Sequence, residues 1–221
     1  MTPAPTPSPL AADAVAGISD PALRAVVLEH WEHMMKWAPT WATTLGDHRY
    51  DDKLARRDAA AIEQSVDERA AMRKRLAAID AAKLGDVDRV THALLAGRLD
   101  AELALEVCKT HEWAVDSGGS SLFGELSYLV ESHTVKTAQD ADNLVTRMTQ
   151  ARKLIDDTIA NLELGLSAGR VAAAEKVRRA IEQLDSELAK PVETWAMANP
   201  PWEGFEAQRA RLREVVANDV Y

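Results

Sequence analysis

The sequence is poor in the residues that support disulfides, β-sheets or a membrane span. Its single cysteine, Cys108, can form neither an intramolecular disulfide nor a cysteine zinc site. None of its nine prolines lies between Pro39 and Pro191, so no proline interrupts helix in that stretch. No window approaches the roughly eighteen uncharged apolar residues that a transmembrane helix needs. The composition therefore excludes a disulfide scaffold and a transmembrane helix.

Alanine is abundant where aromatic residues are scarce. The 221 residues include 39 alanines, whereas aromatic residues make up only 5%. Because alanine is the best helix former and a poor strand residue, this balance favours helices over a β-sandwich or barrel. The segments between the expected helices are short, which is typical of antiparallel neighbours. We expect an all-α protein, an elongated antiparallel bundle of about six to seven helices.

The charge balance argues against two classes of partner. The chain carries 26 basic and 35 acidic residues, a net charge of -9. A phosphate backbone and an anionic membrane surface would both be repelled by this excess of negative charge. We therefore expect neither nucleic acid nor a membrane as a partner.

The first nineteen residues differ from the rest of the chain. They contain alternating prolines, no Lys or Arg, and no apolar run that could form the core of a signal peptide. We expect residues 1–19 to be a disordered tail rich in proline and alanine, and residues 20–221 to form a single helical domain. With no targeting signal in view, we expect a soluble, cytoplasmic protein.

Several helix ends are marked by capping residues. Asp20 followed by Pro21 is typical of a helix start, and Pro39 begins a short segment that should end at Gly46. Thr137, with Asp140 three residues later, resembles a capping box that opens a helix running to about residue 164.

The longest central helix is expected at about residues 87–113. Helical spacing places five residues along one broad stripe: Val90, Leu94, Ala101, Leu105 and Cys108. We expect this stripe to face the core, with Leu94 buried at its centre.

Two short histidine patterns were considered as metal sites. His111–Glu112 begins a zinc-peptidase signature, but position 115 is Val, so one of the two paired ligands is missing. In the sequence EHWEH, His30 and His33 lie three residues apart and could present two donors from one helical face. No third ligand has a recognisable spacing, so ordinary helix residues are the simpler interpretation and His30 and His33 are weak metal candidates.

The glycine-rich segment GGSSLFG, residues 118–124, superficially offers a nucleophilic serine or a phosphate loop. The glycines do not flank either serine as a nucleophile elbow requires, and Glu125 stands where a phosphate loop has its lysine. We interpret the segment as a connector and assign no catalytic residue in this chain.

Residues 39–52, with the sequence PTWATTLGDHRYDD, resemble a known protein family. This segment is similar to a Pro, Ala-Thr, Leu-Gly, Tyr-Asp-Asp pattern near the start of a bacterial family catalogued as domain of unknown function 885. Further matches follow in the same order: LAAID at 76–80, Asp88–Arg89, Leu94–Leu95, SHTVKTAQDA at 132–141, Arg147, and the final pattern V-x-x-x-V-Y ending at Tyr221.

The resemblance implies a role that the residues alone do not reveal. Members of that family look like helical zinc metallopeptidases whose metal-binding histidine-glutamate helix lies in a C-terminal half. By this resemblance, the present chain corresponds to the N-terminal, non-catalytic subdomain, and zinc is expected only in the C-terminal half that it lacks. The residues nearest that missing lobe would be Trp41, Tyr50, Asp51 and Asp52.

Two readings of the chain's function stay open at this point. In the first, the helices shape a cleft together with the missing C-terminal lobe, and the chain is inactive alone. In the second, the chain is a free-standing helical interaction module that binds a protein partner through its long helices. An apolar surface left uncovered would also drive self-association, so we expect a homodimer.

Overall fold

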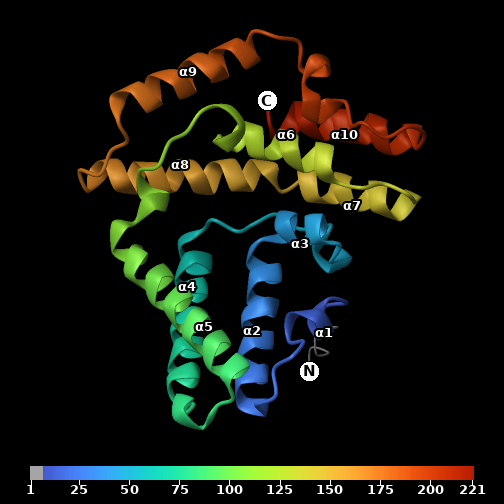
Figure 1. Ribbon diagram of the computed structural model, residues 1–221. Helices are drawn as coiled ribbons and strands as arrows, with labels where there is room; N and C mark the ends of the chain where they lie inside the picture. The colour runs from blue at the N-terminus through green and yellow to red at the C-terminus, as the bar shows by residue number, and fades with distance from the viewer. Residues whose placement is uncertain (1–6) are drawn as a thin grey trace. The chain divides into compact units, whose positions relative to one another are not determined.

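The computed structural model describes residues 7–221, and it is all-α, which confirms the predicted fold class (Figure 1). Between the longer helices lie short 3-10 turns, among them Thr110–Glu112 and Gly118–Ser120. The α-helices are α1 (Ala11–Ala14), α2 (Pro21–Trp37), α3 (Pro39–Leu45), α4 (Ala59–Ala77), α5 (Asp86–Leu105), α6 (Leu122–Ser132), α7 (Ala138–Met148), α8 (Ala151–Ser167), α9 (Ala174–Leu188) and α10 (Glu206–Asp219).

The expected capping residues begin their helices. The Asp20 carboxylate accepts from the backbone N–H of Leu23 at 2.8 Å, and Pro21 is the first residue of α2. At α7, the Thr137 hydroxyl accepts from the N–H of Asp140 while the Asp140 carboxylate accepts from the N–H of Thr137. The capping box is thereby confirmed, although the helix that it opens is interrupted at 149–150 and continues as α8.

The chain divides into two compact units. Among the described residues, unit 1 comprises 7–38 and 59–109, and unit 2 comprises 39–58 and 110–221. In unit 1, α2, α4 and α5 pack together around a core of Val15, Ile18, Leu23, Val26, Met72, Leu76, Leu84, Leu95 and Leu99. The units alternate along the chain because residues 39–58, which lie between α2 and α4 in the sequence, pack with the C-terminal helices in unit 2.

Unit 2 is built around α6, α7, α8 and α10. Helices α7 and α10 pack closely, and α6 packs against the 3-10 turn Ala196–Ala198. Helix α9 passes over α8 (Figure 1). The core of this unit includes Leu54, Leu126, Leu129, Val130, Leu144, Val145, Met148, Leu154, Trp195, Met197, Leu212 and Val216.

Two glycines permit close approaches within unit 2. A Cβ at Gly165, on α8, would lie 1.8 Å from the carbonyl oxygen of Glu112. A Cβ at Gly124, on α6, would lie 2.4 Å from the carbonyl oxygen of Gly118. Because backbone atoms occupy both positions, a side chain at Gly165 would force Glu112 away from α8, and one at Gly124 would force Gly118 away from α6.

The predicted orientation of the central helix is wrong. Leu94 is 70% exposed and Val90 is 59% exposed, whereas Leu95 and Leu99 lie in the core of unit 1. Neighbouring residues on a helix point about 100° apart, so an error of one position selects a different face. The sequence offers two apolar faces on α5, and the one that packs contains Leu95 and Leu99.

The expected disordered tail is only partly within the described chain. Residues 1–6 lie outside the described residues. From residue 8 onward the expectation of disorder is wrong, because α1 forms and Val15 and Ile18 are buried in the core of unit 1. The backbone N–H of Ser19 also donates to the Asp88 carboxylate at 3.1 Å. Apolar burial and this buried acceptor hold a segment whose sequence has little helical periodicity.

None of the helices in residues 7–221 has the length and apolar character needed to cross a bilayer.

Candidate binding pocket

The four residues expected near a second lobe occupy different environments in unit 2. Trp41, on α3, is 54% exposed, and Tyr50 and Asp52 are partly buried. Asp51 is only 2% exposed. Its carboxylate accepts from the Thr43 hydroxyl at 2.6 Å and lies 2.8 Å from His48 Nδ1. Asp51 therefore holds segment 39–58 together and is not a surface contact.

A buried arginine lies at the centre of this segment, and sequence reasoning did not identify its role. Arg147, from α7, has no exposed surface and donates to the Thr43 hydroxyl at 2.8 Å and the Tyr50 carbonyl oxygen at 2.5 Å. Its Nη2 lies 3.7 Å from an Asp51 carboxylate oxygen. Burial lowers the pKa of Arg147 to about 10, so the group is still charged near neutral pH. The arginine is an internal brace that ties α7 to segment 39–58.

His133 lies close to the same brace. Its Nε2 is 3.0 Å from the Asp140 carbonyl oxygen, which can only accept, so Nε2 carries the proton of the neutral ring. Burial and the charge of Arg147 both lower the pKa of His133. Its Nδ1, together with Nε and Nη1 of Arg147, has no hydrogen-bond partner within the protein among the described residues.

The two histidines considered as metal ligands lie on α2 in unit 1. His33 Nδ1 is 3.0 Å from Glu68, a carboxylate that also accepts from Lys36 and from Trp37 Nε1, both at 2.7 Å. Although burial alone would raise it, these hydrogen bonds and one from Gln64 lower the pKa of Glu68 to about 2. His33 is thus committed to a helix-to-helix network with α4.

Among the described residues, no set of side chains completes a zinc site around His30 and His33. Burial and the neighbouring Arg98 guanidinium lower the pKa of His30, and a cation there would meet that positive charge. Among residues 7–221, no group of three or more His, Cys, Asp or Glu side chains is placed to hold a metal ion. His111 does not supply a site either, because its neighbour Glu112 is buried and paired with Arg170.

A cavity in unit 2 lies between α6, α8 and α9, and we call it the α9 pocket. Its volume is about 520 Å³, within the range of small-molecule sites. Trp195 and Tyr221 line the pocket, and the connector at residues 114–121 contributes to the lining. The apolar walls include Phe123, Leu126, Ile155, Ile159, Leu184 and Leu188.

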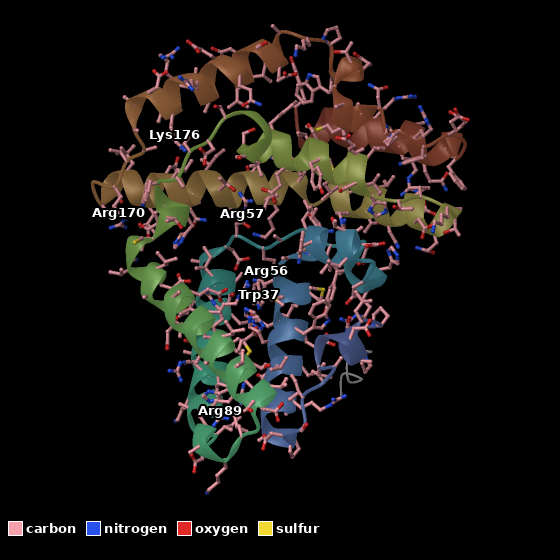
Figure 2. The ribbon with its side chains drawn as sticks, viewed as in Figure 1. Trp37, Arg56, Arg57, Arg89, Arg170 and Lys176 are labelled. Atoms are coloured by element: carbon pink, nitrogen blue, oxygen red, sulfur yellow. The ribbon has the colours of Figure 1, made fainter. Side chains whose placement is uncertain are left out.

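Polar contacts fasten α9 on both sides of its middle. Near its start, Lys176 pairs with Asp116, and just past its middle the Gln183 side-chain oxygen accepts from the N–H of Gly118 at 2.7 Å. Near its end, Trp195 Nε1 donates to the Glu187 carbonyl oxygen at 3.1 Å. Lys176 lies close to the turn that joins α8 to α9 (Figure 2). These contacts hold α9 in place, with its apolar face lining the pocket.

The apolar face of α9 is incompletely covered. Ala180 is buried, but Leu184 and Leu188 are each 47% exposed. Ile159, on α8, is 49% exposed. Aliphatic side chains that line a cavity and remain half exposed would gain by contact with an apolar ligand. The spacing of Ala180, Leu184 and Leu188 in the sequence predicts an apolar helix face. It does not show that a cavity separates this face from α8.

The ionic groups around the α9 pocket are paired with one another. Arg57, on segment 39–58, donates to Glu125 at 2.5 Å, and the Asn161 side chain of α8 donates to the Arg57 carbonyl oxygen at 2.9 Å. Glu187 pairs with Lys190 at 2.7 Å. The rim therefore combines opposite charges in pairs around an apolar interior.

Comparison with known proteins adds a family to this geometry. No curated protein sequence matches the chain. Among protein families, residues 39–221 match the one described as bacterial protein of unknown function, DUF885. The match covers well over half of the chain and takes in every residue of unit 2, with its buried arginine and its pocket. The chain belongs to the DUF885 family, in agreement with the resemblance seen at residues 39–52.

Proposed function

We propose that this chain is a non-catalytic helical binding domain that holds an apolar part of another molecule in the α9 pocket. The observation that carries the proposal is the pocket itself, about 520 Å³ in volume with half-exposed aliphatic walls. Sites that bind small apolar groups have this combination of concave shape and apolar lining. The side chains around the pocket are bound to one another in ion pairs and hydrogen bonds, which suits recognition better than bond cleavage.

Within a metallopeptidase-like protein, such a domain would act as the N-terminal subdomain that forms one side of a substrate cleft. Zinc chemistry would then come from a separate C-terminal lobe, the partner that the resemblance implies. Trp41 supports this role, because its indole is 54% exposed on α3 and is available for contact. Asp51 does not, because its carboxylate is used inside unit 2.

Binding of a neutral fluorescent probe, N-phenylnaphthylamine, tests the proposal. We expect the probe to bind the full chain with enhanced emission, and Leu184→Gln to weaken binding at least tenfold by placing an amide in the apolar wall. The matched control is Leu166→Gln, which alters an exposed leucine of α8 outside the pocket lining and should leave binding unchanged. Equal binding to all three proteins would contradict the proposal.

Elemental analysis and a peptide-cleavage assay test the non-catalytic part. We expect no stoichiometric zinc and no cleavage, because the described residues offer no set of metal ligands. One tightly held zinc per chain, lost on changing His30 or His33 to Ala, would overturn this part while leaving the pocket proposal in place.

A second candidate function is favoured by the exposed face of α5. Val87, Val90, Leu94 and Leu105 are all at least 59% exposed on this helix, and the position of a Cβ at Gly97 is open. As an interaction module, the chain would pair this face with the same face of a second copy. Sedimentation at rising concentration should then show a dimer that Leu94→Gln disrupts, and a strictly monomeric wild-type chain would eliminate this function.

A further inference from the structure

We propose that the α9 pocket takes a single saturated hydrocarbon chain whose polar end is uncharged, such as that of a medium-chain alcohol, ester or amide. This inference rests on the proposed function and names the class of ligand. It follows from the chemistry of the two long walls, the difference between the two ends, and the charges around the rim.

The two long walls are lines of aliphatic side chains. On α8, Ile155, Ile159 and Leu162 recur at helical spacing along about 10 Å of helix. On α9, Ala180, Leu184 and Leu188 do the same along about 12 Å. Facing rows of this kind form a slot that is longer than it is wide, and an extended alkyl chain matches that shape better than a compact ring system.

The two ends of the slot differ in polarity. Trp195 lies beside the end of α9 and contacts Phe123 and Tyr221, with ring centroids 5.1 and 5.6 Å apart. Asp116 of the connector lies beside the start of α9, where it pairs with Lys176 and lines the pocket. The geometry therefore places a ligand's methyl end against the aromatic side chains and its polar end beside the connector.

Charge decides the nature of that polar end. The rim acids Asp116, Glu125 and Glu187 are paired with Lys176, Arg57 and Lys190, respectively. A carboxylate ligand would have to break an existing pair to gain a cationic partner, and the net charge of -9 would repel it. A hydroxyl or amide end needs no counter-ion, and it can hydrogen-bond to Asp116 or to the backbone of the connector.

The experiment is displacement of N-phenylnaphthylamine from the full chain by primary alcohols from hexanol to decanol. Each added methylene buried in the slot should strengthen binding about three- to fourfold, until the slot is full. The alkanoate of the same length, kept below its micelle-forming concentration, should bind at least tenfold more weakly than the alcohol. Leu184→Gln should weaken all the alcohols, whereas Leu166→Gln, at an exposed leucine of α8 outside the pocket lining, should not.

Ala180→Leu provides a second variant that fills the slot instead of making it polar. It should shift the chain length at which affinity stops rising to a shorter alcohol, with circular dichroism confirming unchanged helix content. Affinity that is independent of chain length, or an alkanoate that binds as tightly as its alcohol, would overturn the inference. If the probe binds and Leu184→Gln removes it, but no alcohol displaces it, this inference fails and the proposed function stands. If the probe does not bind the wild-type chain, both fail.

Discussion

The Arg147 guanidinium donates a 2.8 Å hydrogen bond to the Thr43 hydroxyl, 104 residues earlier in the chain. Thr43 in turn donates to Asp51 at 2.6 Å, so the hydroxyl relays between a buried cation and a buried carboxylate. A charge without exposed surface is tolerated only when such partners surround it. The relay makes the fold of segment 39–58 dependent on α7.

Arg147→Met should destabilise unit 2 strongly. Removing one partner of a buried pair typically costs about 3–5 kcal/mol, because the remaining charge stays buried without compensation. Arg152→Met is the control, since Arg152 forms an exposed i,i+4 pair with Asp156 and pairs of that kind contribute about 0.5 kcal/mol or less. Urea unfolding of both variants measures the difference, and equal small losses would show that the buried brace is not needed.

Leu99→Ala and Leu94→Ala should separate the two faces of α5. Leu99 has no exposed surface, so its truncation should cost about 2–5 kcal/mol through lost burial and the cavity left behind. Leu94 is 70% exposed, and its truncation should change the free energy of unfolding by about 0.5 kcal/mol or less. If Leu94→Ala proved the more damaging in chemical denaturation, the orientation of α5 described above would be wrong.

Gly165→Ala and Gly97→Ala should have opposite effects on stability. At Gly165 the new methyl group would collide with the Glu112 carbonyl, so we expect a loss of about 1–3 kcal/mol. At Gly97, in the middle of α5, a Cβ meets nothing within 4 Å, and alanine should stabilise the helix by about 0.5–1 kcal/mol. Thermal unfolding of the two variants provides the comparison, and a stabilised Gly165→Ala would refute the close approach.

The stability of unit 2 should fall on acidification below neutral pH. Burial and Arg147 lower the pKa of His133 in the folded chain, so the unfolded chain binds more protons as the pH falls through the unfolded value of 6.5. Stability present above that value is then lost progressively down to the folded pKa. His133→Gln should weaken this pH dependence, as measured by urea unfolding between neutral and mildly acidic pH. Asp51 and Asp140 favour the protonated form of His133, so an unchanged slope would mean that they outweigh burial and Arg147.

The features that could be predicted are those encoded locally. Alanine content and the distribution of prolines indicate the fold class, and the caps at Asp20 and Thr137 begin the helices expected of them. Segment 39–45 forms its helix as predicted because Pro39 favours the first turn and Gly46 ends it. Each of these signals acts within about one helical turn, so neighbouring residues suffice to read it.

The features that could not be predicted depend on distant partners. Leu94 and Leu95 have equal apolar character, and only the packing of α5 in unit 1 decides which is buried. Arginine is usually found at the surface. The buried position of Arg147 follows from Thr43 and Asp51, which fold against it from a distant part of the chain. The α9 pocket depends on the distance between two amphipathic helices, which a pattern along one helix does not encode.

The polar fastening of α9 has a consequence for local opening of the backbone. Lys176, Asp116 and Gln183 hold this helix through partly exposed contacts, and few of its side chains are buried. Segments with little apolar burial open at a lower free energy than the core of the same unit. The amide hydrogens of α9 should therefore exchange with deuterated solvent well before those of α7, and added salt should speed their exchange by screening the Lys176–Asp116 pair.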